Sequence, residues 1–150
     1  MRGAEANAAQ EAARTGIAVL TTIHANSCEA TYRRMVSLCK RAVDMSDETL
    51  MGYVTEAYPI IVFCKQLENK QRRMMEIMEC EILADGTRNY RTLFQYIITE
   101  NRMDEKGKFY IEGYHEQKCS ISESLSKRLL ENGMPVEMIK NMKRREETMK

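Results

Sequence analysis

The sequence predicts an α/β fold in which buried parallel strands flanked by helices lead into antiparallel strands and a helical C-terminal part. The first observation is the apolar, β-branched run at residues 18–23, which is typical of a central parallel strand with helices on both faces. The second is an alternation of apolar and polar residues between Met78 and Ile98, which is typical of strands with one solvated face. The third is the return of helical apolar spacing after Ser120. No stretch rich in Pro, Gly or Ser separates these parts, so residues 1–150 are predicted to be one domain.

Composition limits the classes of function. The chain has 150 residues, enough to bury a core, and 23 Lys+Arg against 22 Asp+Glu give a formal net charge of +1. This balance, together with the absence of Trp, disfavours nucleic-acid binding. The five cysteines are widely spaced without a Cys-x-x-Cys pair, which argues against a metal site or a disulfide framework and indicates a reducing cytoplasm. The longest apolar run, residues 59–64, is too short to span a membrane.

Two helices are predicted on either side of the first apolar run. One covers residues 3–14, where alanine, the best helix former, stands at positions 4, 6, 8, 9, 12 and 13. The other covers residues 28–43, and its apolar residues repeat at three- and four-residue steps to give one buried stripe. Asn26 and Glu29 have the spacing of a capping pair at its start.

Strands are predicted in the middle of the chain, after a third helix that Ser46 caps and Tyr58-Pro59 ends. Residues 60–63 form a short buried strand in this prediction. Asp85-Gly86 is a tight-turn signal between two alternating strands, and a further antiparallel strand is predicted at residues 109–111.

Two helices are predicted in the C-terminal part. Ser120 and Glu123 have capping-box spacing, Gly133 closes the first helix, and Pro135 opens the second. Residues 143–150 are mostly charged and are predicted to fray.

Polar residues appear where the strand predicted at residues 18–23 ends and the next helix begins. In open α/β sheets, ligands bind at such junctions, so Thr22, His24 and Asn26 are candidates to meet a ligand phosphate. A lone histidine is also common as a hydrogen-bonded residue at a strand end, and this structural interpretation of His24 stays open.

One motif resembles a known family. The run Thr-Thr-Ile-His-Ala-Asn-Ser at residues 21–27, with Arg34 ten residues after His24, resembles the histidine box of the RecA-like secretion ATPases. These are the hexameric motors of type II and type IV secretion and of type IV and Flp pili. Residues 2–6, Arg-Gly-Ala-Glu-Ala, resemble the end of that family's Walker B segment, and residues 72–81 are similar to one of its late strands. The chain has Ile17 where the Flp and type IV branches commonly carry a second histidine.

The resemblance implies an incomplete RecA-like P-loop NTPase core, with residues 1–150 as its C-terminal portion. The sequence contains no Gly-x-x-x-x-Gly-Lys-Ser/Thr phosphate loop, and the family's Walker B glutamate would stand two residues before Arg2, upstream of Met1. As implied roles, His24 is catalytic, while Arg2, Thr22, Asn26 and Arg34 contact the nucleotide. A structural ion pair is an equal alternative for Arg34. The family uses ATP and Mg²⁺, and neither is expected to bind tightly to this chain alone.

Two functions follow from the resemblance. In the first, the chain is the C-terminal fragment of a hexameric ATPase that powers type II or type IV secretion or pilus assembly by ATP hydrolysis, and it is inactive alone. The implied partners are other ATPase subunits and the secretion or pilus platform proteins of the inner membrane, which would place it at the cytoplasmic face of that membrane. In the second, the chain is a non-catalytic half-domain that serves as a binding or scaffold module on a full-length secretion ATPase.

Overall fold

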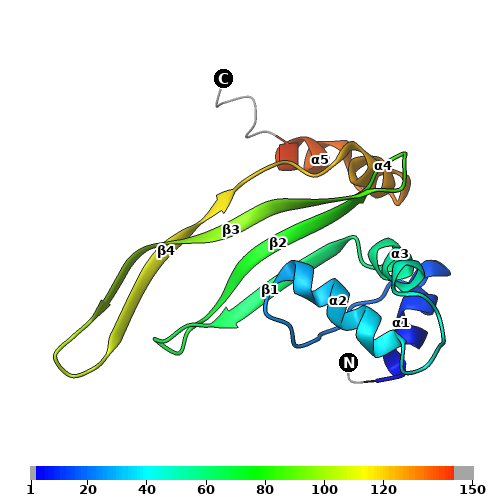
Figure 1. Cartoon of the computed structure of the whole chain (residues 1–150). Coiled ribbons are helices and arrows are strands. Elements are labelled where there is room, and N and C mark those ends of the chain that lie inside the picture. Colours follow the sequence, from blue (N-terminus) through cyan, green and yellow to red (C-terminus); the bar gives the residue numbers. More distant parts are fainter. Residues whose placement is uncertain (1–2, 144–150) are drawn as a thin grey trace. The chain divides into compact units, whose positions relative to one another are not determined.

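The computed structural model describes residues 3–143 (Figure 1). Arg2 and the charged tail after Lys143 lie outside this range. The chain divides into two compact units: unit 1 comprises Met1–Ile61 with Ile82–Arg88, and unit 2 comprises Val62–Glu81 with Asn89–Lys150. The elements, in chain order, are α1 (Glu5–Arg14), α2 (Cys28–Cys39), α3 (Asp47–Ala57), β1 (Ile60–Gln66), β2 (Arg72–Ile82), β3 (Arg88–Met103), β4 (Phe109–Gln117), α4 (Glu123–Glu131) and α5 (Val136–Lys143).

Unit 1 is built on the three helices α1, α2 and α3, which pack against one another. The predicted stripe of α2 is buried, and its largest fully buried members are Tyr32 and Met35. The Tyr32 hydroxyl donates a hydrogen bond to the Tyr58 carbonyl oxygen at 2.7 Å, just after the end of α3. Arg14 of α1 joins α3 through an ion pair with Glu56 at 2.9 Å and lies 3.7 Å from the centroid of the Tyr53 ring. Polar contacts between α1 and α3 therefore border the hydrophobic core of unit 1.

Serine side chains begin two of these helices. The Ser46 side chain accepts a hydrogen bond from the Thr49 backbone N–H, which confirms its predicted capping role at α3. At α2 the cap is Ser27, whose side chain accepts from the Ala30 N–H, so the prediction of an Asn26 cap is wrong by one residue. Asn26 and Ser27 are both good capping types, and local sequence did not distinguish them.

The four strands form one antiparallel sheet in the order β1-β2-β3-β4. The three connecting turns share one geometry: the N–H groups of Leu67, Leu83 and Asp104 each donate to the carbonyl four residues later, with N···O distances of 2.9, 2.9 and 3.0 Å. Lys70, Gly86 and Gly107 occupy the left-handed position of these turns, with φ of 65°, 82° and 77°. Such short turns reverse the chain, so successive strands must run antiparallel.

The prediction of an incomplete RecA-like core with parallel strands is wrong. Within residues 3–143 no two strands are parallel, and residues 18–23 form no strand. The predicted strand at residues 60–63 does form, as part of β1, but its neighbour is the next strand along the chain. A parallel pair needs a crossover of a dozen or more residues, whereas β1 to β4 are joined by short turns.

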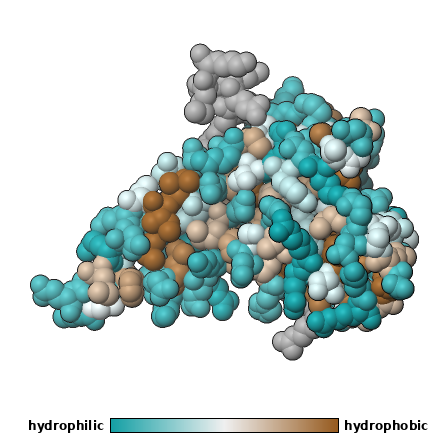
Figure 2. All heavy atoms as spheres, viewed as in Figure 1, coloured by the Kyte–Doolittle hydropathy of each residue, from teal (hydrophilic) through white to brown (hydrophobic). Residues whose placement is uncertain are grey.

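Unit 2 contains the long β3–β4 hairpin and the two C-terminal helices. In register, Tyr96 pairs with His115 and Ile98 with Gly113, and an irregularity between Ile98 and Glu100 shifts the pairing beyond it. In Figure 1 the end of this hairpin extends past β2. Figure 2 shows apolar atoms on its surface, where Ile98 and Met103 are 43% and 61% exposed.

The alternation predicted for β2 fails near its end. Met78, Glu79 and Cys80 are buried in succession, so the Glu79 side does not face solvent as predicted. Both Glu79 carboxylate oxygens accept hydrogen bonds from Ser122, one from its backbone N–H at 2.9 Å and the other from its hydroxyl. Ser122, and not the predicted Ser120, caps α4, because its hydroxyl also accepts from the Leu125 N–H at 3.0 Å.

Candidate functional site

The segment between α1 and α2, residues 17–25, belongs to no helix or strand in the described structure. Its burial alternates: Val19, Thr21, Ile23 and Ala25 are half-buried, while the residues between them are exposed. This period of two is that of a strand with one side against the protein and one side open. Leu20 on the open side is 98% exposed, which is unusual for a large apolar side chain. We call residues 17–25 the exposed segment.

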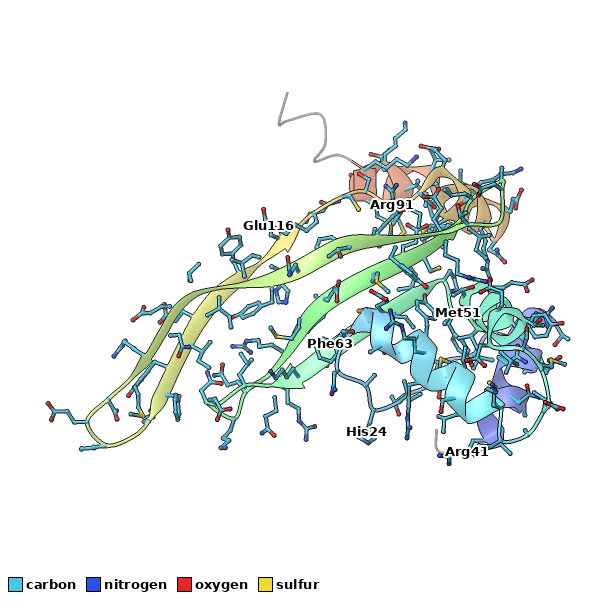
Figure 3. All side chains as sticks on the ribbon, viewed as in Figure 1. His24, Arg41, Met51, Phe63, Arg91 and Glu116 are labelled. Atoms are coloured by element: carbon cyan, nitrogen blue, oxygen red, sulfur yellow. The ribbon has the colours of Figure 1, made fainter. Side chains whose placement is uncertain are left out.

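The structure places the predicted site residues at the surface of unit 1. Thr22, His24 and Asn26 follow Leu20 along the open side, and the His24 side chain points away from the ribbon in Figure 3. Arg34 is exposed on α2. Within residues 3–143, neither His24 nor Arg34 has a described hydrogen bond or ion pair, so the ion pair considered for Arg34 is not seen there. Arg2 lies outside the described residues.

These residues do not fit a nucleotide by themselves. A bound triphosphate needs several donors converging on it, usually backbone N–H groups of a glycine-rich loop and a helix N-terminus. Thr22, His24 and Asn26 are exposed at alternate positions of one segment, and Arg34 is exposed on α2. Thus Thr22, His24, Asn26 and Arg34 could contribute to such a site only beside groups from another chain or segment.

Buried polar side chains in the helical unit were missed by sequence reasoning. Gln10 of α1 is fully buried, and its Oε1 atom has no hydrogen-bond partner among the described residues; the same is true of the buried Tyr58 hydroxyl. Burial, and secondarily the charge of Glu11, raises the pKa of the Cys39 thiol. Burial, and secondarily Cys39, raises the pKa of Tyr58. Both groups are therefore neutral at pH 7, which disfavours Cys39 as a nucleophile.

A second candidate site is an apolar pocket of about 540 Å³ in unit 2. Its lining includes Ile77, Leu93 and Phe94 from the sheet and Met138 and Met142 from α5. Cys119 also lines it, and the thiol donates to the Thr92 carbonyl oxygen at 3.1 Å. Residues this far apart in sequence give no local signal. The pocket has the size and apolar character of a small-molecule site, and the amide side chains of Gln117 and Asn141 also line it.

Two further classes of site were searched in the part of the chain that the structure describes. It contains no group of three or more His, Cys, Asp or Glu side chains placed to hold a metal ion. None of its helices is long and apolar enough to cross a membrane.

Comparison with known proteins adds no assignment. No protein-family model matches the chain, and no curated protein matches it.

Proposed function

We propose that the chain is a binding module that docks on a secretion or pilus-assembly ATPase by adding its exposed segment to the edge of a partner sheet. The single observation that carries this proposal is the strand-like alternation of burial in residues 19–26, on a segment that the structure pairs with no strand. Strand addition is a common mode of recognition, in which backbone hydrogen bonds supply affinity and alternate side chains supply specificity.

The energetics favour a partner that covers the open side. Leu20 is 98% exposed, and burying a leucine side chain contributes about 1.5 to 3 kcal/mol. Thr22 and Ile23 are β-branched and suit a pleated surface, so the segment can join a sheet with little strain. No charged residue lies between Ile17 and Ala25, and an uncharged strand meets no electrostatic penalty on entering a sheet.

The identity of the partner rests on the resemblance of residues 21–27 and Arg34 to the histidine box of secretion ATPases. Residues 1–150 carry this box and no phosphate loop, so a nucleotide site here would need a loop from outside these residues. In this proposal the partners are ATPase subunits, and through them the platform proteins at the cytoplasmic face of the inner membrane. ATP and Mg²⁺ would be held mainly by the partner's residues.

The test measures binding to the full-length secretion ATPase of the same cell by calorimetry and co-elution. Leu20→Asp should abolish the complex, because it places a charge in the new sheet. Val136→Asp is the matched control: Val136 is 56% exposed at the start of α5, in unit 2. Absence of binding by the unmodified chain, or equal loss with the two variants, would refute the docking proposal.

A second candidate function is the catalytic one, in which the chain completes an active site. It is favoured by the position of His24 on the same open side as Leu20, where an added strand would bring partner groups close to it. In the complex, His24→Ala should then lower ATP turnover by roughly ten- to a thousandfold, the loss typical of one positioned donor or proton carrier. His115→Ala is the control and should leave turnover unchanged. Intact turnover with His24→Ala would leave the non-catalytic module as the function.

A further inference from the structure

A polar cavity of about 570 Å³ lies in unit 2. The turn between β1 and β2 and the start of β2 supply Asn69, Gln71 and Arg73 to its lining. The β3–β4 hairpin supplies Tyr96, Lys108 and Gly113, among others. The volume falls within the range of small-molecule sites in proteins. Two cations, two phenols, two amides and one carboxylate thus line one space.

The Tyr96 hydroxyl is a polar group without a partner in this cavity. The Tyr96 side chain is only 8% exposed, and among residues 3–143 no hydrogen bond to its hydroxyl is described. Gly113 keeps the hydroxyl in place: a Cβ atom there would lie 3.0 Å from the Tyr96 hydroxyl oxygen and 2.2 Å from the Ile97 carbonyl oxygen. The hydroxyl oxygen is not among the buried polar atoms of the described residues that lack a hydrogen-bond partner, so it is open to solvent and accessible to a ligand in the cavity.

The two cations of the cavity are not neutralised by a described ion pair. Arg73 donates a hydrogen bond to the neutral Gln71 side chain at 2.5 Å, and Lys108 lies 5.0 Å from the centroid of the Tyr110 ring. Neither has a carboxylate within ion-pair distance in the described structure. Glu112 is the carboxylate in the lining, so the charge of the lining is +1.

The neighbouring acid of the hairpin turn is already engaged. Asp104 accepts hydrogen bonds from the N–H groups of Lys108 and Lys106, both at 2.9 Å, and from the Tyr110 hydroxyl at 3.2 Å. These bonds, the one from Lys108 most of all, hold the pKa of Asp104 below its ordinary value. Asp104 therefore orders the turn that presents Lys108, and its bonds go to the turn itself.

We infer that this cavity binds a phosphate group, carried by a soluble phosphate ester or by a lipid headgroup. The guanidinium of Arg73 offers a planar pair of donors that matches phosphate oxygens, and Lys108 offers a compact positive charge. The Tyr96 hydroxyl, which also lines the cavity, would donate to a third oxygen. The inference does not depend on the proposed docking function, because it rests on residues of unit 2 alone.

The experiment titrates the whole chain with inorganic phosphate and glycerol phosphate at constant ionic strength, followed by calorimetry and by NMR shifts. A parallel arm measures sedimentation with phosphatidylcholine vesicles, with and without phosphatidic acid. We expect saturable binding that Arg73→Gln and Lys108→Gln each weaken about tenfold or more, since each removes charge-assisted hydrogen bonds. Tyr96→Phe should weaken it about fivefold while retaining the ring and the melting temperature.

The matched control is Lys127→Gln. It also removes one positive charge from unit 2, but Lys127 lies on α4, pairs with Glu131 at 3.8 Å and is not among the residues that line the cavity. It should leave binding unchanged. If the soluble phosphates bind, the ligand of the cavity is a soluble phosphate ester. If binding is confined to vesicles with phosphatidic acid, the ligand is a lipid headgroup. Both outcomes support the site. Absence of saturable binding in both arms, or equal weakening by Lys127→Gln and Arg73→Gln, would overturn it.

Discussion

The two histidines of the chain lie in different surroundings, although the sequence presents both among polar neighbours. His24 is exposed on the open side of the exposed segment. The His115 Nε2 atom lies 3.0 Å from the Met74 carbonyl oxygen, and its ring centroid is 5.0 Å from that of Tyr96. His115 therefore stabilises the sheet, whereas His24 is available to a partner.

This difference predicts opposite effects on stability. His24→Ala should leave the free energy of unfolding within about 0.5 kcal/mol of the unmodified chain, as for other exposed residues. His115→Ala should lower it by about 1 kcal/mol, because one hydrogen bond and one ring contact are lost. Urea denaturation followed by circular dichroism measures both. A loss with His24→Ala as large as with His115→Ala would mean that the exposed segment is packed, and would weaken the docking proposal.

At the level of elements, the contact between β2 and the start of α4 is the best-defined link in unit 2. Glu79 is 1% exposed and accepts two hydrogen bonds from Ser122, while Ser122 caps the helix. A carboxylate at a helix N-terminus is also favoured by the helix dipole. Arg91, labelled in Figure 3, donates a hydrogen bond to the Ser120 carbonyl oxygen at 3.0 Å, two residues before Ser122.

Removing either side of this link should be costly. Glu79→Ala should destabilise the chain by about 2 to 3 kcal/mol, because it removes charge-assisted bonds and leaves buried donors unpaired. Ser122→Ala should cost about 1 to 2 kcal/mol through the lost cap. The double variant should cost at least about 0.5 kcal/mol less than the sum, since the two residues are in contact. Glu105→Ala, in an exposed turn, is the control, and additive losses in denaturant unfolding would contradict the link.

At the level of the whole molecule, the sheet has two edge strands. In the strand order, β1 and β4 are the edge strands, and Val62 of β1 is 53% exposed. The exposed segment adds a further template with Leu20. Unpaired edges with apolar side chains recruit other strands unless charge or proline protects them.

We therefore expect the isolated chain to self-associate as its concentration rises. Leu20→Asp and Val62→Lys should each reduce the association, because a charge on an exposed strand opposes edge pairing. Sedimentation velocity over a series of concentrations measures the effect, with Val136→Asp as the control that should leave it unchanged. A monomer at every concentration, with one cooperative melting transition, would show that these edges are protected.

The sequence by itself determined several local features of this protein. The Ser46 cap, the end of α3 before Pro59, the Asp85-Gly86 turn and the helix opened by Pro135 all follow from residues that are neighbours in the chain. These caps and turns are stabilised by backbone dihedral preferences and by hydrogen bonds between residues a few positions apart. Such interactions can be predicted from the local sequence. The resemblance of residues 21–27 to a histidine box also belongs to the sequence, and the proposed function takes only the identity of the partner from it.

Only the tertiary structure decided what lies beside each segment. An apolar run such as residues 18–23 is compatible with a parallel strand, an antiparallel strand or an irregular segment, and here it forms no strand. In the same way, Glu79 is buried because Ser122, far along the chain, supplies its hydrogen bonds, and Tyr96 lines a cavity because Gly113 leaves it room. Strand pairing and the burial of polar side chains depend on contacts between residues distant in sequence. A periodic pattern indicates which face of an element is apolar, but it does not indicate which element covers that face.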